Sequence, residues 1–277
     1  MSSARAWWTI LWLSSLGTLP FWGAGCTEVV ELPPEPGGSH VSPATERNAP
    51  SPRAEPQADS DHVEVVIDTP RIASPTRDGV VHGLPLRADD RALASDARLT
   101  LQGELARYPS RFLKRIGLQR VVICSSLAFD ATPCDAFADV EHGRIFIAIR
   151  ACEDRAALRR TLHHELSHQA DFADDQRLDV DPGWEALNPS GFQYAQDAQR
   201  YQDDPDAATG PPPPGFYSLY ATSSPTEDKA VLYAALVTDR AGTLRRIESD
   251  PILRGKADRL RTLLETLGAD PDPLIGP

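Results

Sequence analysis

Apolar residues recur every three or four positions in several long stretches of the chain, which is the spacing of helices that bury one face. The stretches with this spacing span residues 89–108, 153–172, 225–240 and 250–268, and a shorter one spans 109–117. Within 153–172, Leu158, Leu162 and Leu166 recur every four residues and predict a buried stripe. The pattern therefore predicts a domain made largely of helices.

Two shorter runs have the composition of β-strands. Residues 118–124 and 142–149 are rich in β-branched and aromatic side chains, and Gly143 fits the turn before the second strand. The segment between them, 128–141, is expected to be a loop or an irregular edge strand. The chain shows no internal repeats. These elements predict an α+β domain, rich in helices, with a small β-sheet near its middle.

Residues 1–25 have the features of a secretory signal peptide. Arg5 is their only charged side chain, an apolar run follows it, and small residues lead to Cys26. An uncleaved membrane anchor is the alternative, but Gly17 and Pro20 interrupt a run that is already short for a span of ~20 residues. The placement of Cys26 resembles the lipobox of bacterial lipoproteins, which implies that this cysteine is lipidated.

Residues 26–84 are expected to form a disordered Pro-rich linker. They are rich in Pro, Ser, Ala and Glu and show almost no apolar periodicity, so they cannot bury enough surface to offset their ordering entropy. The short run 62–68 has the composition of a strand, but no partner for it is evident nearby. We therefore expect the folded domain at residues 85–277, held away from a membrane by the linker.

Charge and cysteine content bear on partners and location. The chain of 277 residues has a formal net charge of -12, which argues against nucleic acid because phosphate binding needs clustered Lys and Arg. We expect a monomer, exported as a bacterial lipoprotein to the outer membrane, the periplasm or the cell surface.

In such an exported protein, the three cysteines Cys124, Cys134 and Cys152 predict one disulfide, whose pairing the sequence leaves open. Three reduced core thiols are the alternative.

The strongest chemical signal is the segment HELSH, which contains His164, Glu165 and His168 inside a predicted helix. Two imidazoles four residues apart project from one face of a helix and can bind a single zinc ion. The glutamate is turned ~100° from the first histidine, where it can reach a metal-bound water without being a ligand. The histidines lie off the leucine stripe, as a metal site requires. A helix whose histidines are solvated or hydrogen-bonded is the alternative.

The third protein ligand is not a later histidine, because none follows His168. Met1 is the only methionine, which excludes the Met-turn of metzincins. Asp174 stands six residues after His168, where metzincins place their third ligand. The glycine that would let the chain turn there is replaced by Asp171, so the helix should continue. Asp174 remains the minor candidate.

Glu227 is the stronger candidate, in the first turn of the predicted helix at 225–240. It also completes a capping box that begins at Ser224, and a capping glutamate needs no metal. The ligand interpretation is preferred because the chain carries the two-histidine helix and offers no later histidine.

Together the two segments resemble the anthrax-lethal-factor-like group of gluzincins and related zinc metallopeptidases of bacterial lipoproteins. The resemblance is carried by HHELSH at 163–168 and by GFYSLYATSSPTEDKA at 215–230. It implies a zincin-like metallopeptidase fold, Zn²⁺ as the cofactor, and His164, His168 and Glu227 as the metal ligands.

The resemblance also implies catalytic roles. Glu165 would deprotonate the water and pass the proton to the leaving amine. Tyr220, seven residues before Glu227, would stabilise the oxyanion; as a plain core aromatic it would have no such role. Two positions depart from the family, with Val231 where a second acid is common and Lys229 where an aromatic is common.

Two further side chains lie close to the motif in sequence. Asp171, one turn after His168, is either an acceptor for the imidazole N–H or a solvated helix acid. His163 is expected beside the site or at the surface.

The sequence thus predicts an exported zinc metallopeptidase, lipid-anchored at Cys26, that hydrolyses peptide bonds in a peptide or protein substrate. The alternative is a non-catalytic surface lipoprotein in which the zinc site is structural.

Overall fold

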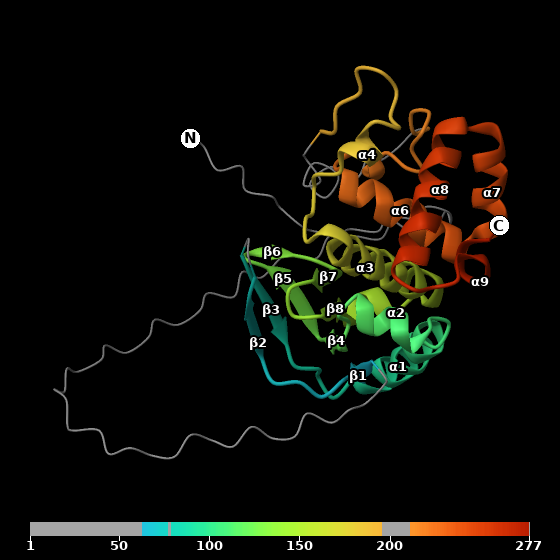
Figure 1. The fold of residues 1–277 in the computed structure, drawn as a ribbon. Helices are drawn as coiled ribbons and strands as arrows, with labels where there is room; N and C mark the ends of the chain where they lie inside the picture. Colours follow the sequence, from blue (N-terminus) through green and yellow to red (C-terminus); the bar gives the residue numbers. More distant parts are fainter. Residues whose placement is uncertain (1–62, 77–78, 196–210, 277) are drawn as a thin grey trace, which may run out of the picture. The chain divides into compact units, whose positions relative to one another are not determined.

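The computed structural model describes residues 63–76, 79–195 and 211–276, which are coloured in Figure 1. The expected signal peptide, Cys26 and most of the expected linker lie outside the described residues. The described chain combines helices with two small sheets, which agrees with the α+β class expected from the sequence.

The strands are β1 (Glu64–Val66), β2 (Ile72–Pro75), β3 (Val80–Leu84), β4 (Arg120–Cys124), β5 (Ser126–Phe129), β6 (Thr132–Pro133), β7 (Ala136–Asp139) and β8 (Arg144–Ala148). The α-helices are α1 (Arg91–Leu105), α2 (Ser110–Arg115), α3 (Arg155–Asp175), α4 (Pro182–Glu185), α6 (Pro225–Thr238), α7 (Arg240–Ser249), α8 (Pro251–Thr266) and α9 (Pro271–Ile275). Short 3₁₀ helices are η1 (Ile149–Cys152) and η3 (Tyr220–Thr222). Within the described part of the chain, no helix is both long and apolar enough to cross a membrane.

The first sheet has the strand order β1-β4-β8-β7, with β7 antiparallel to its neighbour and the other strands parallel. Successive residues of a strand face opposite sides of the sheet. Val121 and Ile123 accordingly belong to the apolar cluster under the helices, whereas Val122 and Cys124 belong to a second cluster. The first sheet is therefore a middle layer that is buried on both faces.

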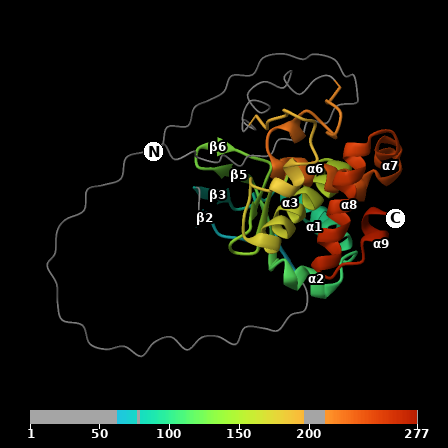
Figure 2. The ribbon, with the colours of Figure 1, turned by 45° about the horizontal axis from the view of Figure 1, so that its top comes forward.

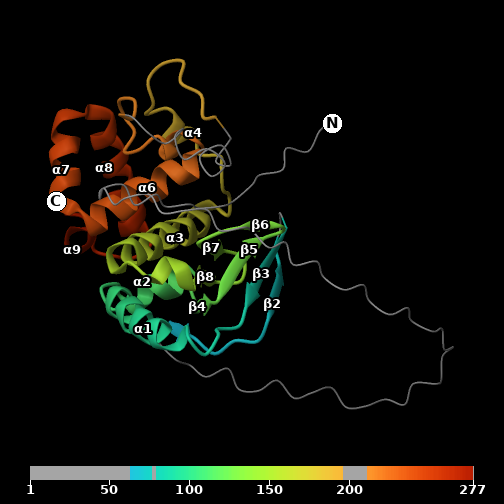
Figure 3. The ribbon, with the colours of Figure 1, turned by 180° about the vertical axis from the view of Figure 1, so that it is seen from behind.

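The second sheet is antiparallel, with the order β2-β3-β5-β6. Its residues Val81 and Phe129 share the second cluster with Phe146 of the first sheet. Figure 3 shows β2 and β3 on the side of the first sheet that faces away from α1 and α3. The layers thus run from helices to the first sheet to the second sheet.

The central element of the helical layer is α3. Asp154 caps its start by accepting hydrogen bonds from two backbone N–H groups of the first turn, and Gln176, in the left-handed conformation, ends it. The expected leucine stripe, Leu158, Leu162 and Leu166, is buried in the cluster against the first sheet. On another side α3 packs along α6, and the two helices lie side by side in both Figure 1 and Figure 2.

The expected linker at 26–84 needs correction at its C-terminal end. The strands β1, β2 and β3 fall within this range and pair with strands of the two sheets, so the folded domain includes them and does not begin at residue 85. The partner of β1 is β4, which comes only after two helices, so nothing in the adjacent sequence reveals it. The segment 128–141, expected as a loop or ragged strand, contains β6 and β7, and α7 and α9 were not expected at all.

The expected disulfide is also wrong, because Cys124, Cys134 and Cys152 are all free and buried. The first sheet separates Cys124, which faces the second sheet, from Cys152, which lies in the cluster under the helices. Burial raises the pKa of each thiol to about 12. The cysteines therefore act as small core residues, which is the alternative that the sequence left open.

Candidate metal centre

His164 and His168 lie one helical turn apart on α3. Their ring centroids are 4.8 Å apart and the ring planes are inclined by 82°. Both side chains are buried, with 0% and 3% of their surface exposed. Because the leucine stripe occupies the face toward the first sheet, the helix presents apolar residues to the core and the two imidazoles to a different neighbour.

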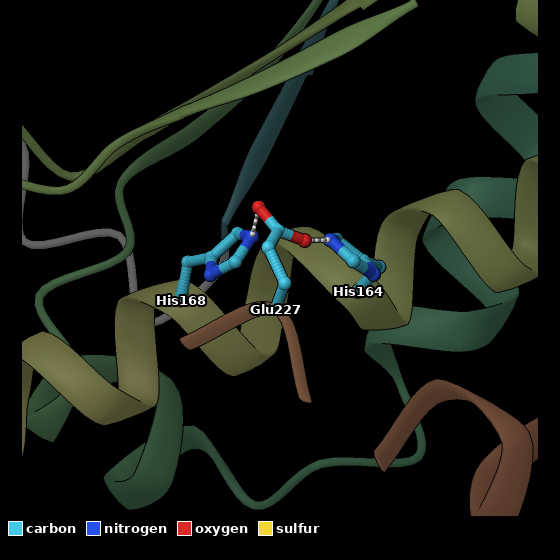
Figure 4. A group of neighbouring side chains, drawn as sticks. All are labelled: His164, His168 and Glu227. Atoms are coloured by element: carbon cyan, nitrogen blue, oxygen red, sulfur yellow. Dashed lines mark ion pairs between the residues drawn. The ribbon is translucent and has the colours of Figure 1, made fainter. Parts of the chain in front are cut away.

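That neighbour is α6, which brings Glu227 to the two rings. Ser224 caps α6, and its hydroxyl accepts the N–H of Glu227 at 3.1 Å. The carboxylate of Glu227 lies 3.0 Å from His164 Nε2 and 3.8 Å from His168 Nε2. Figure 4 shows it between the two rings. Ser224 therefore caps the helix as expected, while the glutamate carboxylate is directed at the histidines.

The three side chains fit a zinc ion. Their candidate ligand atoms all lie within 4.8 Å of one another. Ligand atoms at ~2.0–2.1 Å from a tetrahedral zinc are about 3.3 Å apart. One carboxylate oxygen of Glu227 is 3.0 Å from His164 Nε2, and the other is 3.8 Å from His168 Nε2, which is close to that spacing. Two imidazole nitrogens and a carboxylate oxygen are a donor set that zinc accepts. Asp174 is exposed and is not a member of the group.

The ionisation of the group also suits a metal. Burial lowers the pKa of His168 to about 3, so its ring is neutral. Burial alone would raise the pKa of Glu227, but the charge and hydrogen bond of His164 lower it below its usual value, with Tyr220 contributing a further hydrogen bond. Neutral imidazole and ionised carboxylate are the forms that bind metal ions.

Glu165 is fully buried beside this group. Burial raises its pKa well above the usual value, and the negative charge of Glu227 adds to the shift, while the backbone N–H of Ala138 in β7 opposes it. Neither carboxyl oxygen makes a hydrogen bond of ordinary geometry. Apart from the contact with the Ala138 N–H, no hydrogen bond or ion pair from the described residues occupies this carboxyl group, which leaves it able to exchange a proton with a bound molecule.

Tyr220, at the start of η3, lies next to the same group. Its phenol hydrogen-bonds the carboxylate of Glu227, and its ring centroid is 6.4 Å from that of His164. Tyr217, three residues earlier, has its hydroxyl 3.3 Å from the hydroxyl of Thr243 instead. The structure therefore brings Tyr220, and not Tyr217, to the candidate site.

Asp171 and Lys229 form a buried ion pair near the histidines. The carboxylate of Asp171 is 2.5 Å from Lys229 Nζ, and Lys229 is also 2.9 Å from Asp181. Asp171 is therefore buried and paired with a lysine. It is not a solvated helix acid, which was one of the two interpretations of this residue from the sequence. The sequence interpretation gave Lys229 no role. The available signal was a lysine close to the N-terminal end of a helix, where the helix dipole disfavours a cation unless an acid faces it.

His163 is fully buried, so the expectation of a surface position is wrong. Its Nδ1 lies 2.7 Å from the hydroxyl of Tyr108, and its Nε2 lies 2.9 Å from Glu104. Neither partner was foreseen, because both come from the α1–α2 region, more than fifty positions earlier.

The chain matches no protein-family profile and no curated protein sequence. Its structure is similar to a crystal structure from Bacteroides caccae ATCC 43185, described as a "putative zinc-binding metallo-peptidase", with a TM-score of 0.48 and 12% sequence identity. The similarity covers 76% of this chain and 82% of that one. At this level it establishes no shared function.

Proposed function

We propose that this protein is a zinc-dependent metallopeptidase in which His164, His168 and Glu227 hold the zinc ion and Glu165 is the general base. The observation that carries the proposal is the convergence of three buried donor groups from two helices, with Glu165 beside them. Ionisable groups packed together away from water are costly to maintain unless a cation or protons bind them.

The chemistry follows from these positions. A zinc ion held by the three ligands would supply a Lewis acid and lower the pKa of a water molecule to about 7. Glu165 would accept the proton of that water on its carboxylate and later donate it to the nitrogen of the departing amine. Tyr220 would turn its O–H from Glu227 to the substrate oxygen as negative charge develops there.

A peptide substrate would bind along β7, which lies at an edge of the first sheet and contacts α3. Along a strand in an antiparallel pair, residues whose backbone N–H and C=O groups bond the neighbouring strand alternate with residues whose backbone groups point away from it. The N–H of Ala148 in β8 donates to the carbonyl of Asp135, so the backbone groups of Ala136 and Ala138 face the open edge. An extended peptide can add to such an edge through backbone hydrogen bonds, and Ala138 is the residue that contacts Glu165.

The proposal includes location and partners. The signal-like residues 1–25 and the position of Cys26 support export and a lipid anchor. The net charge of -12 supports peptides or proteins, and not nucleic acid, as partners. We propose that the exported protein acts as a monomer.

A non-catalytic lipoprotein with a structural zinc site is the second candidate. Deep burial favours it, because Glu227 is only 2% exposed and His164 is fully enclosed. Structural zinc sites have four protein ligands, whereas catalytic sites keep one position for water. Among the described residues this group offers three ligands, which favours catalysis.

The test is a zinc assay on the purified protein together with a mixed-peptide cleavage screen, for the wild type and for Glu165→Gln. We expect about one zinc per chain in both proteins and cleavage by the wild type only. Zinc without cleavage in either protein would support the structural role, and absence of zinc from the wild type would remove both candidates.

A further inference from the structure

Four side chains form a hydrogen-bonded chain next to the metal group; three of them are buried and Glu104 is partly exposed. They come from α1 (Glu104), from the connection after it (Tyr108), from α3 (His163) and from α6 (Tyr233). His163 Nε2 is 2.9 Å from Glu104, and His163 Nδ1 is 2.7 Å from the Tyr108 hydroxyl. The Tyr108 hydroxyl is in turn 2.8 Å from that of Tyr233. The chain therefore links the helix that carries the two histidines to the helix that carries Glu227.

One end of this chain has a fixed direction. Glu104 also binds Arg107 at 2.8 Å and Arg159 at 2.5 Å, so it is ionised and can only accept. His163 therefore donates from Nε2 to Glu104. Each tyrosine hydroxyl can both donate and accept, so the Tyr108 hydroxyl can bind His163 Nδ1 and the Tyr233 hydroxyl at the same time.

The second polar link between α3 and α6 lies beyond the metal group, at Asp171 and Lys229. On α3, His163 precedes His164 by one residue and Asp171 follows His168 by three. On α6 the order is reversed, because Lys229 follows Glu227 by two residues and Tyr233 comes later. The two helices are thus antiparallel. The two links bracket His164 and His168 on α3, whereas on α6 both lie on the C-terminal side of Glu227.

Helix α6 needs such links because it has no polar face. Every residue from Pro225 to Val237 is buried. An amphipathic helix is oriented by its apolar stripe, but a helix that is buried on all sides lacks that signal. A slip of one residue along α6 would rotate Glu227 by ~100° and shift it by ~1.5 Å. Such a slip would also break the hydrogen bonds between the two helices, whose energy falls steeply with misalignment.

We infer that the chain Glu104–His163–Tyr108–Tyr233 is a positioning device that holds α6 in the register and rotation at which Glu227 meets His164 and His168. This inference rests on the proposed function, since it concerns the zinc site of that function. Tyr233 and Tyr108 are positioning residues: their hydroxyls bind each other and His163, and they act through the placement of α6.

The test measures zinc affinity of the metal-free protein by competition with a chelator, and the visible spectrum of the Co²⁺-substituted protein. Tyr233→Phe removes one hydroxyl and keeps the ring. Groups that orient metal ligands typically change metal affinity 10–100-fold, so we expect the zinc Kd to rise about 10-fold and the Co²⁺ bands to change in intensity. The melting temperature of the metal-free variant should fall by only a few degrees, as expected for one buried hydrogen bond.

Tyr217→Phe is the matched control, because its hydroxyl meets Thr243 of α7 and not α3. It should leave the zinc Kd within about twofold of the wild type, since it lies outside the link between the two helices. Tyr108→Phe, which interrupts the same chain at its centre, should raise the Kd at least as much as Tyr233→Phe.

Wild-type zinc affinity and Co²⁺ spectra in both chain variants would overturn the inference, as would an equal loss in Tyr217→Phe. The proposed function fails separately, and takes the inference with it, if the wild-type protein itself binds no zinc.

Discussion

The interface between the two sheets and the interface between α3 and α6 are both buried, but they are built from different side chains. Between the sheets the cluster consists of apolar residues and two thiols, with Phe129 stacked on Phe137 at 5.1 Å. Between the helices lie imidazoles, carboxylates and a lysine. Apolar burial stabilises the first interface without any directional requirement. The second interface depends on the distances and directions of the polar contacts between its side chains.

The start of α6 shows this most clearly. Glu227, Asp228 and Lys229 are consecutive and buried, and each has a different partner. Glu227 faces the histidines, Lys229 pairs with Asp171, and Asp228 lies 2.6 Å from Lys256. Well-packed apolar residues often stabilise a fold as much as buried ion pairs do. We therefore expect the charged interface to serve the proposed function and the apolar one to serve stability. The predictions below separate the two interfaces, beginning with the largest effect.

Glu165→Gln should abolish most peptide cleavage while zinc content stays at the wild-type level. Acid–base catalysis by one group contributes on the order of 10²–10⁴ in rate, and the amide cannot accept the proton. The measurements are kcat/KM on the best peptide found in a screen and the zinc content of each protein. Equal loss of zinc in the variant would show that Glu165 has another role.

Phe146→Ala should lower the stability of the protein and leave the zinc site unchanged. Phe146 is 1% exposed in the cluster between the sheets, and removing a buried phenylalanine ring costs ~3–5 kcal/mol of stability. Chemical denaturation should show this loss, whereas the zinc affinity of the folded protein should stay the same. Leu99→Ala is the control, because Leu99 is 65% exposed. A large change in zinc affinity in Phe146→Ala would mean that the two interfaces are not separable.

Tyr220→Phe should lower kcat by about 10²–10³, the usual cost of losing one oxyanion donor. The ring and the three ligands remain, so zinc content in excess metal should hardly change, although loss of the hydrogen bond to Glu227 should weaken zinc affinity. KM should change less than kcat. Tyr217→Phe should keep nearly full activity. Wild-type cleavage by Tyr220→Phe would return Tyr220 to the role of a core aromatic.

The smallest effect is expected from reductant. Because Cys124, Cys134 and Cys152 are free in the structure, adding a reducing agent should not shift the melting temperature. Alkylation of the denatured, non-reduced protein followed by mass mapping should find a label on all three cysteines. A disulfide-linked peptide would contradict the core packing described for them.

The contrast between the interfaces also explains what the sequence could predict. The spacing of His164 and His168 is local and fixes their common face on a helix, and the proline and cap at the start of α6 locate Glu227 in its first turn. The roles of these residues in binding zinc stay predictions. The pairing of β1 with β4, by contrast, joins two strands that are separated in the sequence by α1 and α2. The sequence also does not show which face of the first sheet each cysteine lies on, and Cys124 and Cys152 lie on opposite faces, which made the disulfide prediction wrong.

The sequence pattern also could not predict which polar and charged side chains are buried. Lys229 and Asp171 occupy positions that an isolated helix would expose, and only the packing of α6 on α3 brings them together. His163 is similar, because its partners Tyr108 and Glu104 lie in a different part of the chain.

The most direct test of the account is a zinc titration of the metal-free protein, in competition with a chelator, for the wild type, Glu227→Ala and Asp174→Ala. Loss of a metal ligand should weaken binding by more than the ~10–100-fold typical of residues that only orient ligands. The account predicts that Glu227→Ala loses more than ~100-fold in zinc affinity while Asp174→Ala keeps the wild-type value. Wild-type affinity in Glu227→Ala with a large loss in Asp174→Ala would contradict it, and would place the third ligand on α3 instead of α6.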